Sequence, residues 1–204
     1  MAVSWLKKGK AAHEAVEAAD KQTEQKKASS SVFRYYLPKE KEGQITFLDG
    51  DLDDDGLLET VTFWEHQLLL NGSWRNWFTC TQDSEPCPIC QGGDNSPSLV
   101  AVLSIIDHSE WKDKKGGVHK NERKLFVCKR ETFKRLQNLA TKRGGLKGAT
   151  FDVSRIGDKA PVVGSDFDFV EKRPLSEVQK AYGLDEENVT AYDYEKVLIY
   201  RDAN

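Results

Sequence analysis

The chain contains no hydrophobic run long enough to cross a membrane. Its most apolar stretch, residues 99–107, is far shorter than the roughly 20 residues that a membrane-spanning helix needs. Residues 1–8 also lack the long apolar core of a secretory signal peptide. We therefore expect a soluble protein of the reducing cytoplasm, a compartment that suits metal-bound thiolates.

Cysteine and histidine are scarce, with four of each in 204 residues, yet three cysteines and one histidine gather in one short stretch. They are His66, Cys80, Cys87 and Cys90. In the turn Cys87-Pro88-Ile89-Cys90, two thiolates can bind one metal ion from a single loop, and the other two residues complete the tetrahedron that zinc accepts. These four residues predict a closed structural zinc site with no open position for catalysis.

Two alternatives concern the same cysteines. They could be small buried hydrophobic residues or form disulfides, although structural zinc is the usual role of this spacing inside cells. Cys128 could also replace His66 as the fourth ligand. Closing a loop of 38 residues from Cys90 costs more entropy than closing one of 14 from His66 to Cys80, and Cys128 lies in a strand-like pattern. We therefore favour His66 as the ligand and expect Cys128 to be a core or groove thiol.

The net charge of −3 conceals a strong segregation of charge along the chain. Residues 112–147 hold 13 Lys and Arg against 3 acidic residues, whereas residues 40–60 hold 8 acidic residues and one Lys. Residues 158–204 are also acidic, with 11 acidic residues against 6 basic ones. A charge run is usually a solvated face, but the basic block also contains aromatic residues, which favours binding to a polyanion.

Hydrophobic periodicity predicts a mainly β protein with a few helices. Alternating patterns predict strands, one helix has its apolar residues on a single face and ends at Gly144-Gly145, and Ser176 is expected to cap a shorter helix. The expected strands are 32–37, 43–48, 59–64, 99–107, 123–129, 148–156 and 167–171, and the expected helices are 131–143 and 177–182.

Short strands around one core, with a helix between late strands, are typical of a small, partly open barrel of the OB-fold type. We expect this core to span residues 31–173 and to carry a zinc-binding loop at about 64–92. We expect residues 1–30 to form a helical, mobile arm that ends at a serine hinge, and residues 174–204 to form a C-terminal helix and tail.

Aromatic residues stand next to cations in several segments, as binding of single-stranded nucleic acid requires. Unpaired bases stack on aromatic rings while cations contact the phosphates, with little sequence preference. Of the neighbours Tyr35 and Tyr36, strand alternation places only one toward a groove. The candidate contact residues are Arg34, Tyr36, Trp74, Arg75, Trp77, Trp111, Lys112, Lys114, Lys115, Arg123, Lys124, Phe126, Lys129 and Arg130.

The order of these motifs resembles one known family. His66, then Asn71-Gly72-Ser73-Trp74, Cys80 and Cys87-Pro88-Ile89-Cys90, followed by an apolar strand and a basic strand and helix, resembles the zinc-containing single-stranded DNA-binding protein of T-even bacteriophages. The resemblance covers roughly residues 30–172 and is most specific around the cysteines. It assigns the four zinc-ligand roles to the same residues.

The resemblance implies an OB-fold core that coats single-stranded DNA during phage DNA replication, recombination and repair, in the cytoplasm of an infected bacterium. Its implied partners are neighbouring copies of the chain and replication proteins. The family begins with a short basic motif that mediates contacts between neighbours, and Lys7, Lys8 and Lys10 are the residues that match it here. The family also ends in a long acidic tail, whereas this chain stops at Asn204 with only a mild acidic excess.

Other functions fit the sequence less well. An RNA-binding or transcription-regulating zinc protein would use the same basic and aromatic features. A zinc nucleobase deaminase needs Glu two residues after its His, but Leu68 stands there, and Cys80 would fill the water position. We therefore expect no enzyme and no catalytic residue. The acidic stretch 51–56 opens like a calcium loop, but its twelfth position is Thr62 rather than Glu.

Overall fold

A computed structural model describes residues 9–17, 20, 32–93, 95–112 and 116–198 of the chain. The chain divides into two compact units, and the first joins Met1–Phe33 to Asp193–Ile199. In this unit residues 10–17 are helical, and Lys10 pairs with Glu14 one turn later at 3.6 Å. The proposed neighbour-contact residues Lys7 and Lys8, and the serine hinge, lie outside the described residues.

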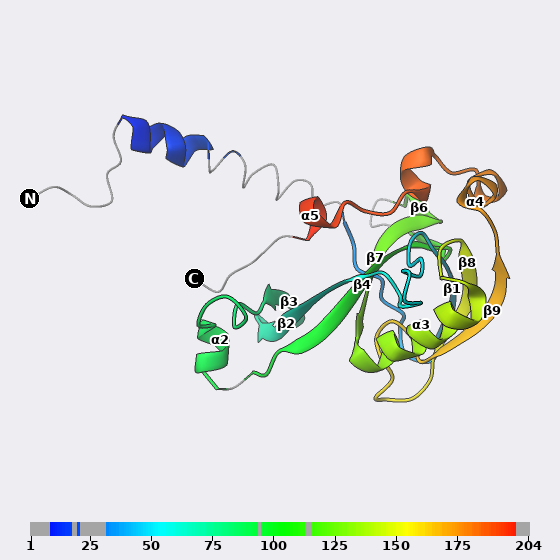
Figure 1. Cartoon of the computed structure of the whole chain (residues 1–204), viewed down its shortest axis with the longest axis horizontal. Helices are drawn as coiled ribbons and strands as arrows, with labels where there is room; N and C mark the ends of the chain where they lie inside the picture. Colours follow the sequence, from blue (N-terminus) through cyan, green and yellow to red (C-terminus); the bar gives the residue numbers. More distant parts are fainter. Residues whose placement is uncertain (1–8, 18–19, 21–31, 94, 113–115, 199–204) are drawn as a thin grey trace, which may run out of the picture. The chain divides into compact units, whose positions relative to one another are not determined.

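The second unit, Arg34–Tyr192 with Tyr200–Asn204, is mainly β and antiparallel (Figure 1). The strands are β1 (Lys41–Phe47), β2 (Val61–Leu70), β3 (Ser73–Thr79), β4 (Ser98–Asp107), β5 (Trp111–Lys112), β6 (Val118–His119), β7 (Glu122–Lys129), β8 (Ala149–Arg155) and β9 (Asp166–Lys172). The helices are α2 (Pro88–Gln91), α3 (Arg130–Arg143), α4 (Leu175–Tyr182) and the 3-10 helix η1 (Glu186–Val189), and α5 (Tyr194–Val197) belongs to the first unit. None of the helices in the described part of the chain has the length and hydrophobicity of a membrane span.

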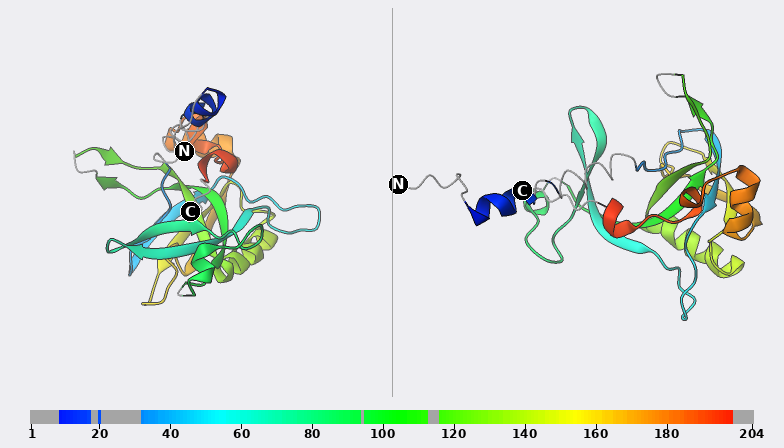
Figure 2. Two further views of the ribbon diagram at one scale, coloured as in Figure 1. Left: turned by 90° about the vertical axis from the view of Figure 1, so that its left-hand side faces the viewer. Right: turned by 90° about the horizontal axis from the view of Figure 1, so that it is seen from above.

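Strand β4 is the centre of the sheet because it pairs with three other strands. Along one edge it pairs with β7 from Val100 to Asp107. Along the other edge its first half pairs with β2 and its second half with β1. The sheet continues from β1 to β8 and β9, and α3 connects β7 to β8. Strands β2 and β3 extend beyond the other strands as a ribbon that carries α2 (Figure 2).

Both faces of β4 are buried, which explains its apolar run without polar alternation. Ala101, Leu103 and Ile105 face the main core, which also contains Phe47 and Phe151. On the opposite face, Ile106 packs in a second cluster with Leu48 of the β1 end, Val178 of α4 and Val189 of η1. The segment after β9 therefore covers the outer face of β4, so the sequence boundary placed at residue 173 falls inside the larger unit.

Helix α3 forms as its spacing predicts. Leu136 and Ala140 are fully buried, and Phe133 and Leu139 pack against the same core. Gly144 ends the helix in the left-handed conformation, with φ 65°, and its N–H bonds to the carbonyl of Ala140. The shorter helix differs from its prediction, because α4 begins at Leu175 with Pro174 at the N-cap and no side-chain cap from Ser176.

The strand predicted at 32–37 does not form, although its alternation is real. Tyr35 and Leu37 are buried and Tyr36 is 53% exposed. The N–H of Tyr35 bonds to Leu125 of β7 and the N–H of Leu37 to Val162, so the segment makes single bonds to two different partners rather than a ladder. Pro38 then follows and has no N–H to continue any pairing.

The expectation that Phe126 stacks on bases is wrong. Its ring is 0% exposed and packs edge-on against Phe47 and close to Tyr35. The prediction was based on the cations next to Phe126 in the sequence. Adjacent residues of a strand face opposite sides of the sheet, however, and the side chain of Phe126 faces the core. Phe126 therefore stabilises the main core rather than contacting a ligand.

Replacing Phe126 with alanine should lower the free energy of unfolding by about 3–5 kcal/mol, because it leaves a large cavity in the core. The matched control is Tyr36→Ala, which removes an exposed ring and should change stability by less than about 0.5 kcal/mol. Urea unfolding followed by circular dichroism measures both. Equal, small losses for the two variants would contradict the buried position of Phe126.

Candidate metal centre

The ribbon brings together the four residues that the sequence singled out. His66 lies in β2, and Cys80 follows β3 directly, where its N–H bonds to the carbonyl of Trp64 across the ribbon at 2.8 Å. Cys87 is the N-cap of α2 and Cys90 lies within that helix. Pro88 at the first helical position suits the tight turn, since its ring presets the backbone and a free N–H is not needed there.

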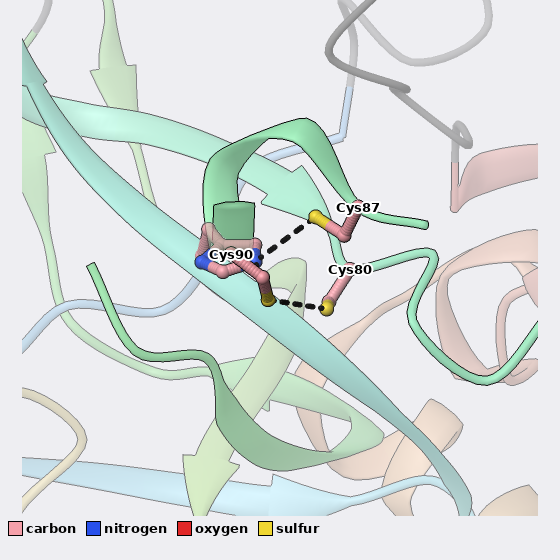
Figure 3. Close-up of side chains that lie close together, drawn as sticks. Cys80, Cys87 and Cys90 are labelled. Carbon is pink, nitrogen blue, oxygen red and sulfur yellow. Dashed lines mark hydrogen bonds between the residues drawn. The ribbon is translucent and has the colours of Figure 1, made fainter. Parts of the chain in front are cut away.

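The ligand-type atoms of these residues all lie within 4.8 Å of one another. His66 Nε2 is 3.4 Å from Cys87 Sγ and 3.5 Å from Cys90 Sγ, and Cys80 Sγ is 3.6 Å from Cys90 Sγ (Figure 3). Ligands around a tetrahedral ion with metal–sulfur bonds of about 2.3 Å are separated by about 3.5–3.8 Å. The four residues are therefore close enough to hold a metal ion, and a donor set of three sulfurs and one imidazole nitrogen is compatible with zinc.

Asn95 determines which nitrogen of His66 faces the cysteines. The Asn95 side-chain N–H₂ donates to the carbonyl of Gln67 at 2.9 Å, so its Oδ1 faces His66 Nδ1, also at 2.9 Å. An oxygen can only accept there, so His66 Nδ1 carries the proton and Nε2 keeps its lone pair. His66 is 0% exposed and is thus held in the tautomer that a metal ligand needs.

The surroundings of Cys87 and Cys90 favour the thiolate form of Cys87 and the neutral thiol form of Cys90. Burial alone would raise the pKa of Cys87, but backbone N–H groups of Cys90, Thr81 and Ile89 bond to its sulfur and lower the pKa to about 6. Burial, followed by the nearby sulfurs of Cys80 and Cys87, raises the pKa of Cys90 to about 12. Without a cation, Cys90 therefore stays a thiol beside the Cys87 thiolate, and a metal ion would supply the positive charge that stabilises both sulfurs as thiolates.

Cys128 takes no part in this cluster. It lies in β7, is 1% exposed and belongs to the main core. Burial raises the pKa of Cys128 to about 12, so it remains a neutral thiol. Its position agrees with the expectation of a core thiol and leaves His66 as the fourth residue of the cluster.

Some of the predicted nucleic-acid contact residues are exposed, whereas others form ion pairs or hydrogen bonds within the protein. Tyr36 and Trp111 are 53% and 39% exposed, and Lys112, Lys129 and Arg130 are also exposed. The side chains of Trp74 and Arg75, and the residues Lys114 and Lys115, lie outside what the structure describes.

Arg34 and Trp77 are engaged at the base of the ribbon. The Arg34 guanidinium forms a two-pronged ion pair with Glu65 of β2, with Nη1 3.0 Å from Oε1, and lies 4.2 Å from the ring centroid of Trp77 in β3. Arg34 also bridges to Leu125 of β7 through its backbone. This arrangement ties the ribbon to the segment that bonds to β7. The sequence reasoning missed Glu65, because no local signal pairs residues 31 positions apart.

Arg123 and Lys124 also form hydrogen bonds and an ion pair within the protein. Arg123 donates to the carbonyls of Glu187 and Thr190 at 2.7 and 2.9 Å, and its guanidinium lies 4.0 Å from the ring centroid of Tyr192. Lys124 pairs with the buried carboxylate of Asp107 at 2.8 Å. Both cations therefore hold the fold together in this structure, which the sequence reasoning did not foresee.

Compared with known proteins, the chain matches no protein-family model, no curated protein and no solved structure. The resemblance to the phage protein family thus depends on the residues around the cysteines and the order of the motifs that follow.

Replacing Asn95 with alanine should weaken metal binding by about 10- to 100-fold, because His66 loses the partner that fixes its tautomer. Competition with a chromophoric chelator measures this affinity for Zn²⁺ or Co²⁺. Gln91→Ala, which changes an exposed residue of α2, is the control and should bind as the wild type does. An Asn95→Ala affinity equal to that of the control would remove Asn95 from the site.

Proposed function

We propose that the chain binds single-stranded DNA without sequence preference, through an OB-fold core that carries a zinc-stabilised ribbon. The observation that carries this proposal is the order of five strands around the main core. The pairs β1–β4, β4–β7, β1–β8 and β8–β9, with α3 between β7 and β8, support a partly open, five-stranded barrel of the OB-fold type. In that fold the face of the second and third strands, which correspond to β4 and β7, binds oligonucleotides. Here α4 and η1 cover the outer face of β4, so we place the contacts beside that face, in the β5–β6 hairpin, at the end of β7 and at Tyr36.

The position of the ribbon supports the same function. It is inserted between β1 and β4, which is the first loop of such a barrel, and this loop contributes to oligonucleotide binding in OB-folds. We propose that zinc is the ion held by His66 and the three cysteines. A closed site of this kind would stabilise the ribbon and supply no reaction, so the proposed activity is binding rather than catalysis.

Exposed residues of the proposed surface provide the chemistry that unpaired DNA needs. Trp111 and Tyr36 expose aromatic rings for base stacking, and Lys112, Lys129 and Arg130 expose cations for phosphates. Arg130 pairs with the exposed Glu131 at 3.1 Å, a contact that a phosphate could replace at small cost. We further propose a role in replication, recombination and repair, together with neighbouring copies, as the resemblance implies.

Protein purified without chelators should contain one zinc ion per chain by elemental analysis. Cys87→Ser should lose most of this zinc, because one ligand is removed from a four-residue cluster. Cys128→Ser is the control and should keep its zinc, since Cys128 lies in the core. Absence of zinc from the wild type, or equal zinc in both variants, would contradict the site.

The chain should bind oligo(dT) with micromolar or tighter affinity that falls steeply with salt, because counterions are released from the phosphates. Replacing Lys129 or Arg130 with alanine should reduce the slope of log K against log salt by about 0.7 each, the value for one phosphate contact on a single strand. Lys180→Ala, an exposed change on α4, should leave it unchanged.

Fluorescence anisotropy with labelled oligo(dT), duplex DNA and oligo(U) measures these affinities side by side. Equal affinity for duplex would contradict stacking on unpaired bases. Tighter binding of oligo(U) than of oligo(dT) would assign the surface to RNA instead.

A further inference from the structure

Two aromatic rings form a preassembled stack in the connection between β4 and β7. Trp111 of β5 and His119 of β6 are directly paired across this short hairpin. Their ring centroids are 4.3 Å apart and the ring planes differ by 12°. The residues Lys114 and Lys115 between the two strands lie outside the described residues. One face of the indole is thus covered by imidazole, while 39% of Trp111 stays exposed.

The carboxylate of Glu122 holds both rings. Trp111 Nε1–H donates to Glu122 Oε2 at 2.7 Å, and His119 Nδ1 lies 3.1 Å from Glu122 Oε1. Glu122 is the first residue of β7, and the Lys124 ammonium lies 3.6 Å from it. The carboxylate therefore connects the hairpin to the rigid sheet. Strands of two residues have little stability of their own, so this connection decides where the indole lies.

We propose that Glu122 and His119 are positioning residues that hold Trp111 as a preformed platform for an unpaired base. The inference rests on the proposed binding of single-stranded DNA. A fixed ring costs less conformational entropy when a base stacks on it than a freely rotating ring does. Lys112 and Lys120 are exposed beside the two rings and could contact the flanking phosphates.

If Glu122 positions Trp111, removing the Glu122 carboxylate should change the affinity for DNA in the direction opposite to that expected from charge alone. Removing an acidic residue from a DNA-binding surface should strengthen binding if charge alone matters. If Glu122 holds the platform, Glu122→Ala should instead weaken binding of oligo(dT). The loss should approach that of Trp111→Ala, about 5- to 150-fold for one stacked base. Glu122→Gln keeps an oxygen that accepts the indole N–H, so it should lose less than Glu122→Ala.

The test is a double-mutant cycle with full-length protein and labelled oligo(dT). If Glu122 acts through Trp111, the double variant Trp111→Ala/Glu122→Ala should bind as weakly as Trp111→Ala alone. His119→Ala should likewise have no further effect once Trp111 is absent. Glu110→Ala removes the exposed carboxylate next to Trp111 and should bind as tightly as the wild type or more tightly. Thermal unfolding of each variant shows whether the fold is intact.

The outcomes separate this inference from the proposed function. Wild-type affinity or tighter in Glu122→Ala, or additive losses in the double variant, would overturn the positioning role while DNA binding stands. No binding of oligo(dT) by the wild type would overturn the proposed function itself.

Discussion

Strand β4 holds the larger unit together, because β1, β7 and the β2 strand of the ribbon all pair with it. Its two edges bond to three strands, and both of its faces are covered by apolar side chains. A polar residue in its centre would face either the main core or the segment that contains α4. Ser104 is the exception, and it is satisfied because its hydroxyl accepts the N–H of Tyr192. The position of β7, which ends at Lys129, therefore depends on this one strand.

The cysteine cluster and the Arg34 contact together define where the ribbon lies. The cluster holds α2 at the base of the ribbon, where His66 follows Glu65 in β2, and the ion pair of Arg34 with Glu65 joins the same base to the segment that bonds to β7. Glu65 is 8% exposed, so losing one partner would leave an uncompensated buried charge. Arg34, which the sequence assigns to phosphate binding, thus orients the ribbon. An acidic residue near a proposed contact for a polyanion is therefore not always repulsive, because some of these residues hold cations or rings in place.

Local features of the sequence predicted much of this structure. The spacing of Cys87 and Cys90 predicted the cluster because a turn determines that geometry, and the apolar spacing from Phe133 to Ala140 predicted α3 because a helix depends on near neighbours. The errors involve partners far away in the sequence. Phe126 was assigned to a groove because its neighbours are cationic, and the strand at 32–37 was expected because no local signal shows that its N–H groups bond to Leu125 and Val162. Arg123 is similar, since its partner Glu187 lies 64 residues away.

The pairing of β1 with β8 has a consequence for how the chain acquires its fold. Gln44 and Asp152, which face each other across this pair, are 108 residues apart in sequence. The ribbon and the β4–β7 pair, in contrast, join residues that follow each other closely along the chain. Because long loops cost more entropy to close, the local pairs can form before β1 has a complete partner. During synthesis on the ribosome, the edge of β1 that pairs with β8 therefore stays unpaired until β8 emerges. An early metal ion in the ribbon would keep the intervening segment compact through that interval.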